Sequence, residues 1–165
     1  MSLKLTVLGC HSATPRVNFY PTAQFLEIKN HNFLIDCGEG TQVQLRKYGV
    51  KFSKIKHIFI SHLHGDHCVG ILGFLQTMTL QNRTEPIEIY GPEGIEELIA
   101  ANTKIMNFGL SFPVLITPIN EGVIVSEEKY EVRTCEAEHS VPTFSFLLEE
   151  KEKPGTFYPE KAISL

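Results

Sequence analysis

Features of membrane and secreted proteins are missing from this sequence. No run of apolar residues approaches the length that spans a bilayer, and no signal peptide is visible, since Lys4 already lies in a strand-like run. No CxxC pair occurs, because the four cysteines are widely spaced: Cys10, Cys37, Cys68 and Cys135. This pattern predicts reduced, mostly buried thiols in a cytoplasmic protein without membrane association, rather than a disulfide framework or a structural zinc knot.

Aspartate is scarce, and an excess of positive charge is absent. Only two of the 19 acidic residues are aspartates, Asp36 and Asp66. The net charge of -4 and the pI of about 6.0 exclude a broadly basic surface, so any nucleic acid would be bound through a local patch or a metal site. Because a short carboxylate is preferred in turns, caps and tight ligand geometry, both aspartates are candidate functional residues.

The length and the residue pattern predict one layered domain over residues 1–165. The chain has 165 residues, of which 42% are hydrophobic and 21% charged, as in ordinary globular proteins. Strands are expected at 4–9, 24–38 (a hairpin turning at 30–32), 56–61, 87–91, 114–119, 122–126, 130–138 and 143–150, and helices at 39–49, 69–81 and 92–109. Hairpins early and late with helices between them favour an α/β (α+β layered) fold.

The segment SHLHGDH, Ser61 to His67, concentrates metal-ligand side chains directly after a short apolar strand. Residues two apart in an extended segment face the same way, so His62 and His64 would point at one metal ion. Gly65 allows a tight turn that brings Asp66 and His67 to a second position close by. The alternatives are a chance cluster or satisfied core histidines, and the rarity of this pattern in such a composition favours metal binding.

Further ligands are expected from separate loops at strand ends. His139 follows a predicted strand and opens a loop, which makes it the best additional candidate. Asp36 precedes a glycine-rich turn into a helix, where an aspartate usually holds backbone N–H groups, and from there it can also brace the histidine loop. Of the remaining histidines, His11 is expected to be exposed, His31 to lie in a turn and His57 to be structural.

The motif and its surroundings resemble ribonuclease Z, the endonuclease that trims the 3′ trailer from precursor tRNA. The HxHxDH pattern after a buried strand is the signature of the metallo-β-lactamase fold, and the resemblance runs over almost the whole chain. It is carried by LIDCGEGTQVQL (34–45), KIKHIFISHLHGDHCVGILGFL (54–75), IEIYGPEGI (87–95), the loop at residue 139, and EKPGTF with EKA (152–157 and 160–162). The DCGEGTQ and KPGTF motifs are the more specific to this family.

The resemblance implies a four-layer αββα sandwich and two-metal hydrolysis of a phosphodiester. His62, His64 and His139 match the ligands of one zinc ion, while Asp66 and His67 match ligands of the other. The general base proposed for the family also falls at Asp66. The implied cofactor is Zn²⁺, with two ions per complete active site, and the implied partner is precursor tRNA.

Two departures from the family pattern limit what the resemblance implies. No aspartate follows Asp66 and no histidine follows His139, whereas the family supplies a bridging aspartate and another histidine later in its chain. We therefore expect the N-terminal portion of the fold only and a second metal position with too few ligands. The uncovered sheet face of such a portion predicts that the chain either pairs with another copy as a homodimer or is part of a longer protein. The loop at residues 12–21 also matches the substrate-contacting loop of the family poorly.

Two other functions stay open on the sequence alone. In the first alternative, the protein to which this chain belongs is a different hydrolase of the same fold, which acts on a small phosphodiester or an ester. The chain by itself would bind at most one zinc ion, without catalysis, if it acts only as a metal-binding fragment. A secreted β-lactamase is disfavoured, because no signal peptide is visible.

Overall fold

The first layer of the molecule is a six-stranded mixed sheet. The computed structural model describes residues 3–28 and 31–151. The strands of this sheet are, in spatial order, β1 (Leu3–Gly9), β2 (Ala23–Ile28), β3 (His31–Ile35), β4 (His57–Phe59), β5 (Ile87–Gly91) and β6 (Val114–Pro118). β1 to β3 form an antiparallel meander, and β3 to β6 run parallel. The parallel strands therefore end at one common edge of the sheet.

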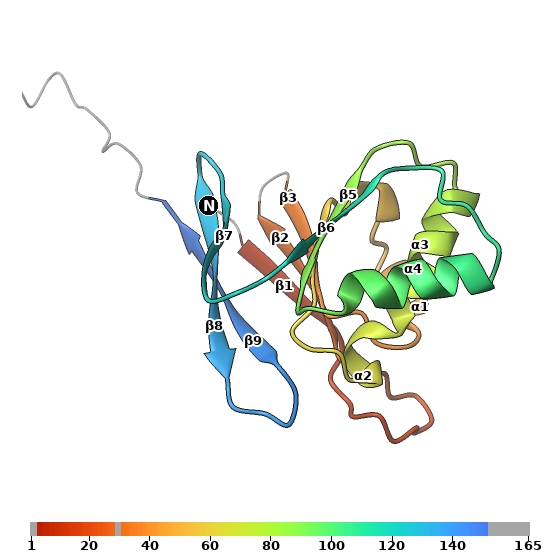
Figure 1. Cartoon of the computed structure of the whole chain (residues 1–165), viewed down its shortest axis with the longest axis horizontal. Helices are drawn as coiled ribbons and strands as arrows, with labels where there is room; N and C mark the ends of the chain where they lie inside the picture. The colour runs from red at the N-terminus through yellow and green to blue at the C-terminus, as the bar shows by residue number, and fades with distance from the viewer. Residues whose placement is uncertain (1–2, 29–30, 152–165) are drawn as a thin grey trace, which may run out of the picture.

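The helices connect the parallel strands and lie together on one side of the sheet (Figure 1). They are α1 (Thr41–Lys47), the short 3₁₀ helix η1 (Phe52–Lys54), α2 (Gly65–Cys68), α3 (Gly70–Leu80) and α4 (Ile95–Ile105). Parallel neighbours need such crossover connections, because a tight hairpin joins only antiparallel strands. The opposite side of the sheet faces a second sheet of three antiparallel strands, β7 (Gly122–Ser126), β8 (Tyr130–Ala137) and β9 (Thr143–Glu150).

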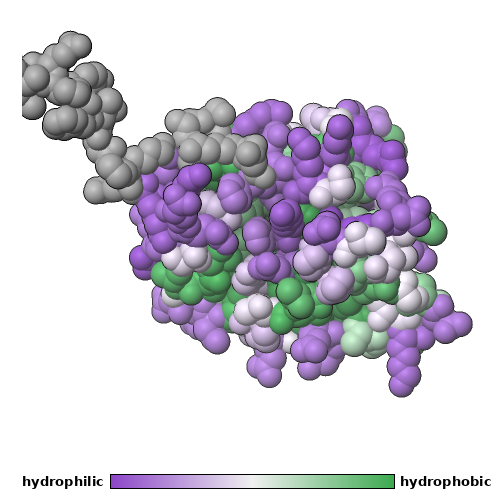
Figure 2. Space-filling model, turned by 90° about the horizontal axis from the view of Figure 1, so that it is seen from above, coloured by the Kyte–Doolittle hydropathy of each residue, from purple (hydrophilic) through white to green (hydrophobic). Residues whose placement is uncertain are grey.

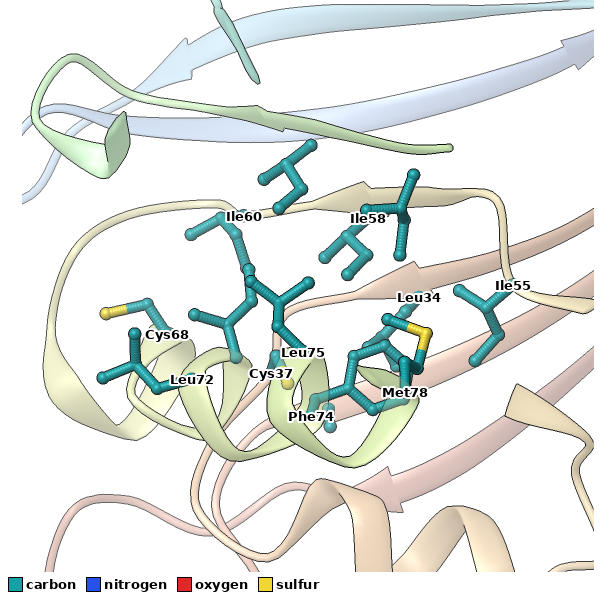
Figure 3. Close-up of a cluster of buried hydrophobic side chains, with 14 of the residues drawn as sticks. Leu34, Cys37, Ile55, Ile58, Ile60, Cys68, Leu72, Phe74, Leu75 and Met78 are labelled. Atoms are coloured by element: carbon teal, nitrogen blue, oxygen red, sulfur yellow. The ribbon is translucent and has the colours of Figure 1, made fainter. Parts of the chain in front are cut away.

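Each side of the six-stranded sheet buries its own hydrophobic core. Between sheet and helices, Phe74, Leu75 and Met78 of α3 point toward Leu34 and Ile58 of the strands (Figure 3). Alternate residues of the same strands point the other way into the space between the two sheets, as the period of two in a strand requires. That second core contains Leu26, Phe33, Phe59, Tyr90, Tyr130, Val132 and Phe144, among others.

These layers give the class that the sequence predicts. The described residues form a sandwich of one helix layer and two sheet layers, and every predicted strand and helix occurs with small changes at its ends. η1 was not expected from the sequence. His31 is the first residue of β3 rather than a turn residue, because its ring packs against the buried Tyr130 at a centroid distance of 5.0 Å.

Three further expectations concern the surface, the cysteines and the C-terminal motif. Hydrophilic side chains cover much of the face in Figure 2, with hydrophobic areas between them. Among residues 3–28 and 31–151, no helix is both long and apolar enough to cross a membrane. All four cysteines are free, but only two of them are buried, Cys37 and Cys68. The KPGTF and EKA motifs lie outside the described residues.

Candidate metal centre

The predicted site lies where the parallel strands β3 and β4 end. Asp36 directly follows β3, and its backbone N–H donates a hydrogen bond of 2.8 Å to the carbonyl oxygen of Phe59 in β4. The next residues after β4 are Ile60, Ser61 and His62, so both chains leave the sheet at the same edge. Ligand sites in open sheets occur at this carboxyl edge, because loops can converge there without disturbing the buried strands.

His62, His64 and His139 form a tripod of imidazole rings. One ring nitrogen from each residue lies within 4.8 Å of the other two. All three pairs of rings have centroid separations of 4.9 Å and interplanar angles of 81°, so the rings are arranged around a common centre with near-threefold symmetry. This is the arrangement in which three side chains can share one ion.

The spacing of the nitrogens within the tripod suits a small tetrahedral ion. His139 Nε2 and His64 Nδ1 are 3.1 Å apart. Zinc–nitrogen bonds of about 2.1 Å at tetrahedral angles place two ligand nitrogens about 3.4 Å apart, which is close to this separation. His62 is buried, His64 is half-buried and His139 is exposed, so the tripod opens toward solvent on one side. The three residues therefore fit the metal that the sequence predicts and leave a path by which an ion and a substrate can enter.

His139 reaches the tripod because the two sheets are joined at this edge. It lies in the loop between β8 and β9, about 70 residues after the histidine run. The backbone N–H of Phe144 in β9 donates a hydrogen bond of 3.0 Å to the carbonyl oxygen of Ser61. This bond between the sheets holds the start of β9 against the end of β4 and brings the preceding loop over the site.

Asp66 and His67 lie beside the tripod on the short helix α2, as a second pair. The nearest carboxylate oxygen of Asp66 is 3.8 Å from Nε2 of His67. The His67 ring lies against the His62 ring, with centroids 3.9 Å apart. The side chains of Asp66 and His67 are 15% and 20% exposed, so both remain reachable from solvent. The tripod and the pair of Asp66 and His67, which the sequence analysis assigned to two separate metal positions, thus lie next to each other.

Asp36 braces both halves of the site through three hydrogen bonds. Its Oδ1 accepts a bond of 2.8 Å from the backbone N–H of Ser61. Its Oδ2 accepts bonds from the hydroxyl of Ser61 at 2.9 Å and from Nδ1 of His67 at 2.8 Å. The Asp36 side chain is only 6% exposed, so these bonds are formed away from water. This matches the bracing role considered for Asp36 from the sequence.

The same network fixes which nitrogen of each ring carries a proton. Nδ1 of His67 donates to Asp36, which leaves Nε2 with its lone pair facing Asp66. The Ser61 hydroxyl donates to Asp36, so its oxygen accepts from Nδ1 of His62 at 3.0 Å and leaves Nε2 of His62 free. One buried carboxylate therefore prepares two rings for ligation, one of them through a serine.

Burial and charge act on these two rings in opposite directions. Burial, helped by the neighbouring His67, lowers the pKa of His62 and favours the neutral form that a ligand needs. The hydrogen bond to Asp36 raises the pKa of His67. Burial also raises the pKa of the Cys68 thiol to about 11, so this cysteine beside the site stays protonated and acts as a packing residue.

The sequence did not assign a role to Ser61, although it is the first residue of the motif. Its hydroxyl contacts Asp36 and His62 at once, and a sequence carries no signal for such a bridge. His11 is half-buried rather than exposed as expected, and its Nε2 has no hydrogen-bond partner among the described residues. His57 is buried against Phe33 and Tyr90, which confirms its structural role.

Comparison of the chain with solved structures places it in the metallo-β-lactamase fold class. The human tRNase Z short form superposes with a TM-score of 0.79 and 33% identity, over 88% of this chain and 64% of that chain. The metallo-beta-lactamase fold protein YhfI from Bacillus subtilis superposes with a TM-score of 0.70 and 20% identity, over 89% of this chain and 58% of that one. The second likeness concerns the fold alone.

Comparison of the sequences gives the family. A family model described as "Anti-Pycsar protein Apyc1" matches residues 3–153, and the chain belongs to that family. Curated relatives named ribonuclease Z share 52% identity in Nitrosopumilus maritimus and 43% in Methanothermobacter thermautotrophicus, each over 99% of this chain. The alignments cover 54% and 53% of those relatives, so the chain spans about half their length. The predicted resemblance to ribonuclease Z is thereby confirmed.

Proposed function

We propose that the protein to which this chain belongs is a metal-dependent endoribonuclease that removes the 3′ trailer of precursor tRNA. The observation that carries the proposal is the tripod of His62, His64 and His139 directly beside Asp66 and His67. The names of the relatives support the substrate: ribonuclease Z in Nitrosopumilus maritimus and Methanothermobacter thermautotrophicus, and tRNase Z in human. The free cysteines of the described residues and the proposed tRNA substrate support a cytoplasmic location.

In this proposal, two adjacent metal positions both take part in the hydrolysis of the phosphodiester. His62, His64 and His139 hold one zinc ion, and Asp66 and His67 contribute to a second position. Bound zinc ions supply a Lewis acid for the phosphate and lower the pKa of a water molecule. Imidazole and carboxylate ligands of this kind suit zinc but also accept other first-row ions.

The residues of the chain orient the reactants and move the proton. The Asp66 carboxylate is the base that takes a proton from the attacking water, and its partial exposure leaves it accessible. Asp36 keeps the His67 and His62 rings in their ligating tautomers through the hydrogen bonds described above. The exposed side of the tripod, at His139, is where the scissile phosphate would approach.

The second position has too few ligands among the described residues. Asp66 and His67 provide two, whereas catalytic zinc sites use three protein ligands and one open position. We propose that the remaining ligands come from elsewhere in the longer protein or from a second copy of the chain in a homodimer. The tripod has the three ligands it needs, so it should fill first as the zinc concentration rises.

The test is zinc stoichiometry measured together with cleavage of a precursor tRNA. The purified chain should bind one zinc ion tightly, as measured by elemental analysis after gel filtration. Cleavage on the 3′ side of the discriminator base should require a preparation that also fills the second position. A chain that holds no zinc, and whose complete protein leaves precursor tRNA intact, would refute the proposal.

A small phosphodiester is the second candidate substrate. The description of the matching family does not name a ribonuclease, so the family match leaves room for a different phosphodiester. A chromogenic aryl phosphodiester and a precursor tRNA should be offered to the same preparation. Hydrolysis of the small ester with no cleavage of the RNA would favour this second candidate.

A further inference from the structure

The positive charge of the chain is concentrated in one segment. Residues 46–56 contain five of the 15 lysines and arginines: Arg46, Lys47, Lys51, Lys54 and Lys56. No aspartate or glutamate occurs between Glu39 and Asp66. A segment of charge +5 is unusual in a chain of net charge -4, and local concentration of this kind is a mark of polyanion binding. We call residues 46–56 the basic segment.

All five cationic side chains of the basic segment face solvent and are free to bind a ligand. Each of these residues is exposed. Within the part of the chain that the structure describes, no carboxylate lies within ion-pairing distance of any of them. The guanidinium of Arg46 lies over the Phe52 ring at 5.3 Å, which holds it in place without neutralising it. None of these five charges is therefore neutralised by an ion pair with another described residue.

The basic segment also lines two hollows that share Val50 and Lys51. The larger hollow, of about 600 Å³, is also lined by Lys4, Lys54 and the half-exposed ring of Tyr48. Its one carboxylate is that of Glu27, which pairs with Lys4 at 3.0 Å. The smaller hollow, of about 270 Å³, is lined by Arg46, Phe52, Ser53 and Gln81 with the shared residues. Cations beside aromatic rings in a concave surface suit phosphates and unstacked bases.

The basic segment lies at the end of the sheet opposite to the metal centre. It precedes β4, whereas the histidine run follows β4 (Figure 1). His62 is the sixth residue after Lys56, and an extended chain over six residue steps spans about 20 Å. The face seen in Figure 2 includes this end of the molecule and carries many hydrophilic side chains. A substrate that contacts both regions must be long, which excludes a mononucleotide and fits a folded RNA.

We propose that the basic segment is a second RNA-contacting surface, which grips the phosphate backbone of the precursor tRNA away from the scissile bond. This inference rests on the proposed function, because it assigns the two regions to one substrate. The contacts are to phosphates, so they add affinity and position the RNA without reading its sequence. They are not part of the chemistry at the metal centre.

The experiment compares Lys51→Gln/Lys54→Gln with the matched control Lys104→Gln/Lys129→Gln. The control removes two exposed lysines from outside the basic segment, at the end of α4 and between β7 and β8. Binding of the full chain to a fluorescent precursor tRNA is measured by anisotropy over a series of salt concentrations. Two lost phosphate contacts should lower the slope of log affinity against log salt by about 1.5, with weaker binding at low salt. The control should keep the parental slope.

Each outcome separates this inference from the proposed function. In a preparation that fills both metal positions, hydrolysis of a small aryl phosphodiester should be the same in parent and variant, since such a substrate at the metal centre is too short to contact the basic segment. A parental salt slope in the variant, with cleavage of precursor tRNA intact, would overturn the inference alone. A lowered slope in a protein that cleaves no precursor tRNA would support the RNA-contacting surface and count against the proposed function.

Discussion

Replacing Asp36 with asparagine should weaken metal binding far more than it weakens the fold. The new amide has nearly the shape of the carboxylate and keeps one acceptor oxygen for the backbone N–H of Ser61. It places an NH₂ group where Oδ2 now accepts from Ser61 and His67. Both rings of the network are then pushed toward the wrong tautomer, with a proton on the nitrogen that should bind metal.

The expected magnitude follows from the network. Loss of a carboxylate that supports a metal-bound histidine typically costs 10–100-fold in metal affinity, or about 1.4–2.7 kcal/mol. Asp36 supports His67 directly and His62 through Ser61, so we expect the upper half of that range. The cost to the metal-free fold should be about 1–2 kcal/mol, because the hydrogen-bond partners can reorient around the amide.

The backbone at Asp36 makes asparagine the right replacement. Its φ is 56°, in the left-handed region that asparagine and aspartate tolerate better than other side chains. Asp36→Ala would introduce about 1–2 kcal/mol of backbone strain in addition to the loss of the hydrogen bonds. The effect of the strain and the effect of the lost bonds could then not be separated. Glu27→Gln is the matched control, because it makes the same chemical change at an exposed ion pair with Lys4.

The assay has two readouts on the same preparations. Zinc affinity is measured by competition with a chromophoric chelator, and the free energy of unfolding is measured by urea titration with excess chelator. If Asp36→Asn binds zinc within about threefold of the parent, as Glu27→Gln should, then the tautomer argument is incorrect. A loss of stability as large as the loss of metal affinity would also contradict it.

Three further predictions concern the metal ligand, the packing and the pH response. His139→Ala leaves the tripod with two ligands, so zinc affinity in the chelator assay should fall by at least about 100-fold, more than for a supporting group; an unchanged affinity would remove His139 from the site. Gly70→Ala would place a methyl group 2.0 Å from the carbonyl oxygen of Gly38, so the free energy of unfolding in urea should fall by about 3 kcal/mol or more. In the matched variant Gly73→Ala, the new methyl group meets only a flexible side chain at 3.4 Å, so the free energy of unfolding should rise by up to about 1 kcal/mol. Burial lowers the pKa of His57, so as the pH drops below the usual value of 6.5 the unfolded chain takes up the proton before the folded chain does. The free energy of unfolding should therefore fall as the pH drops toward the pKa of the folded state. His57→Phe should flatten this pH dependence, and an equally steep fall in the variant would mean that another group causes it.

Much of the fold could be predicted from local patterns. The buried strands β3, β4 and β5 are short apolar runs, and α3 and α4 follow turn residues at the expected places. Errors occurred where a tertiary contact decides the local state. His31 begins β3 because its ring packs on Tyr130, which is 99 residues away in sequence. η1 was missed because three residues carry too weak a periodic signal.

The class of chemistry available to this protein can be inferred from local features of its sequence. The HxHxDH spacing places two imidazoles on one side of an extended segment, and the motif contains one of the two aspartates of the chain. These are local properties, and the class of site follows from them. Most of the cysteines were expected to be buried, but Cys10 and Cys135 are exposed, which shows the limit of such inference, since burial depends on what packs above a residue.

The way in which the parts of the site meet depends on long-range packing. The register of parallel strands β3 and β4 brings Asp36 to Ser61, and the hydrogen bond from β9 to Ser61 brings the His139 loop over His62. Tautomers, the serine bridge and the separation of the basic segment from the metal centre all follow from these long-range contacts. A linear pattern carries no information on which strand edges coincide, because that is settled by the packing of whole layers against one another.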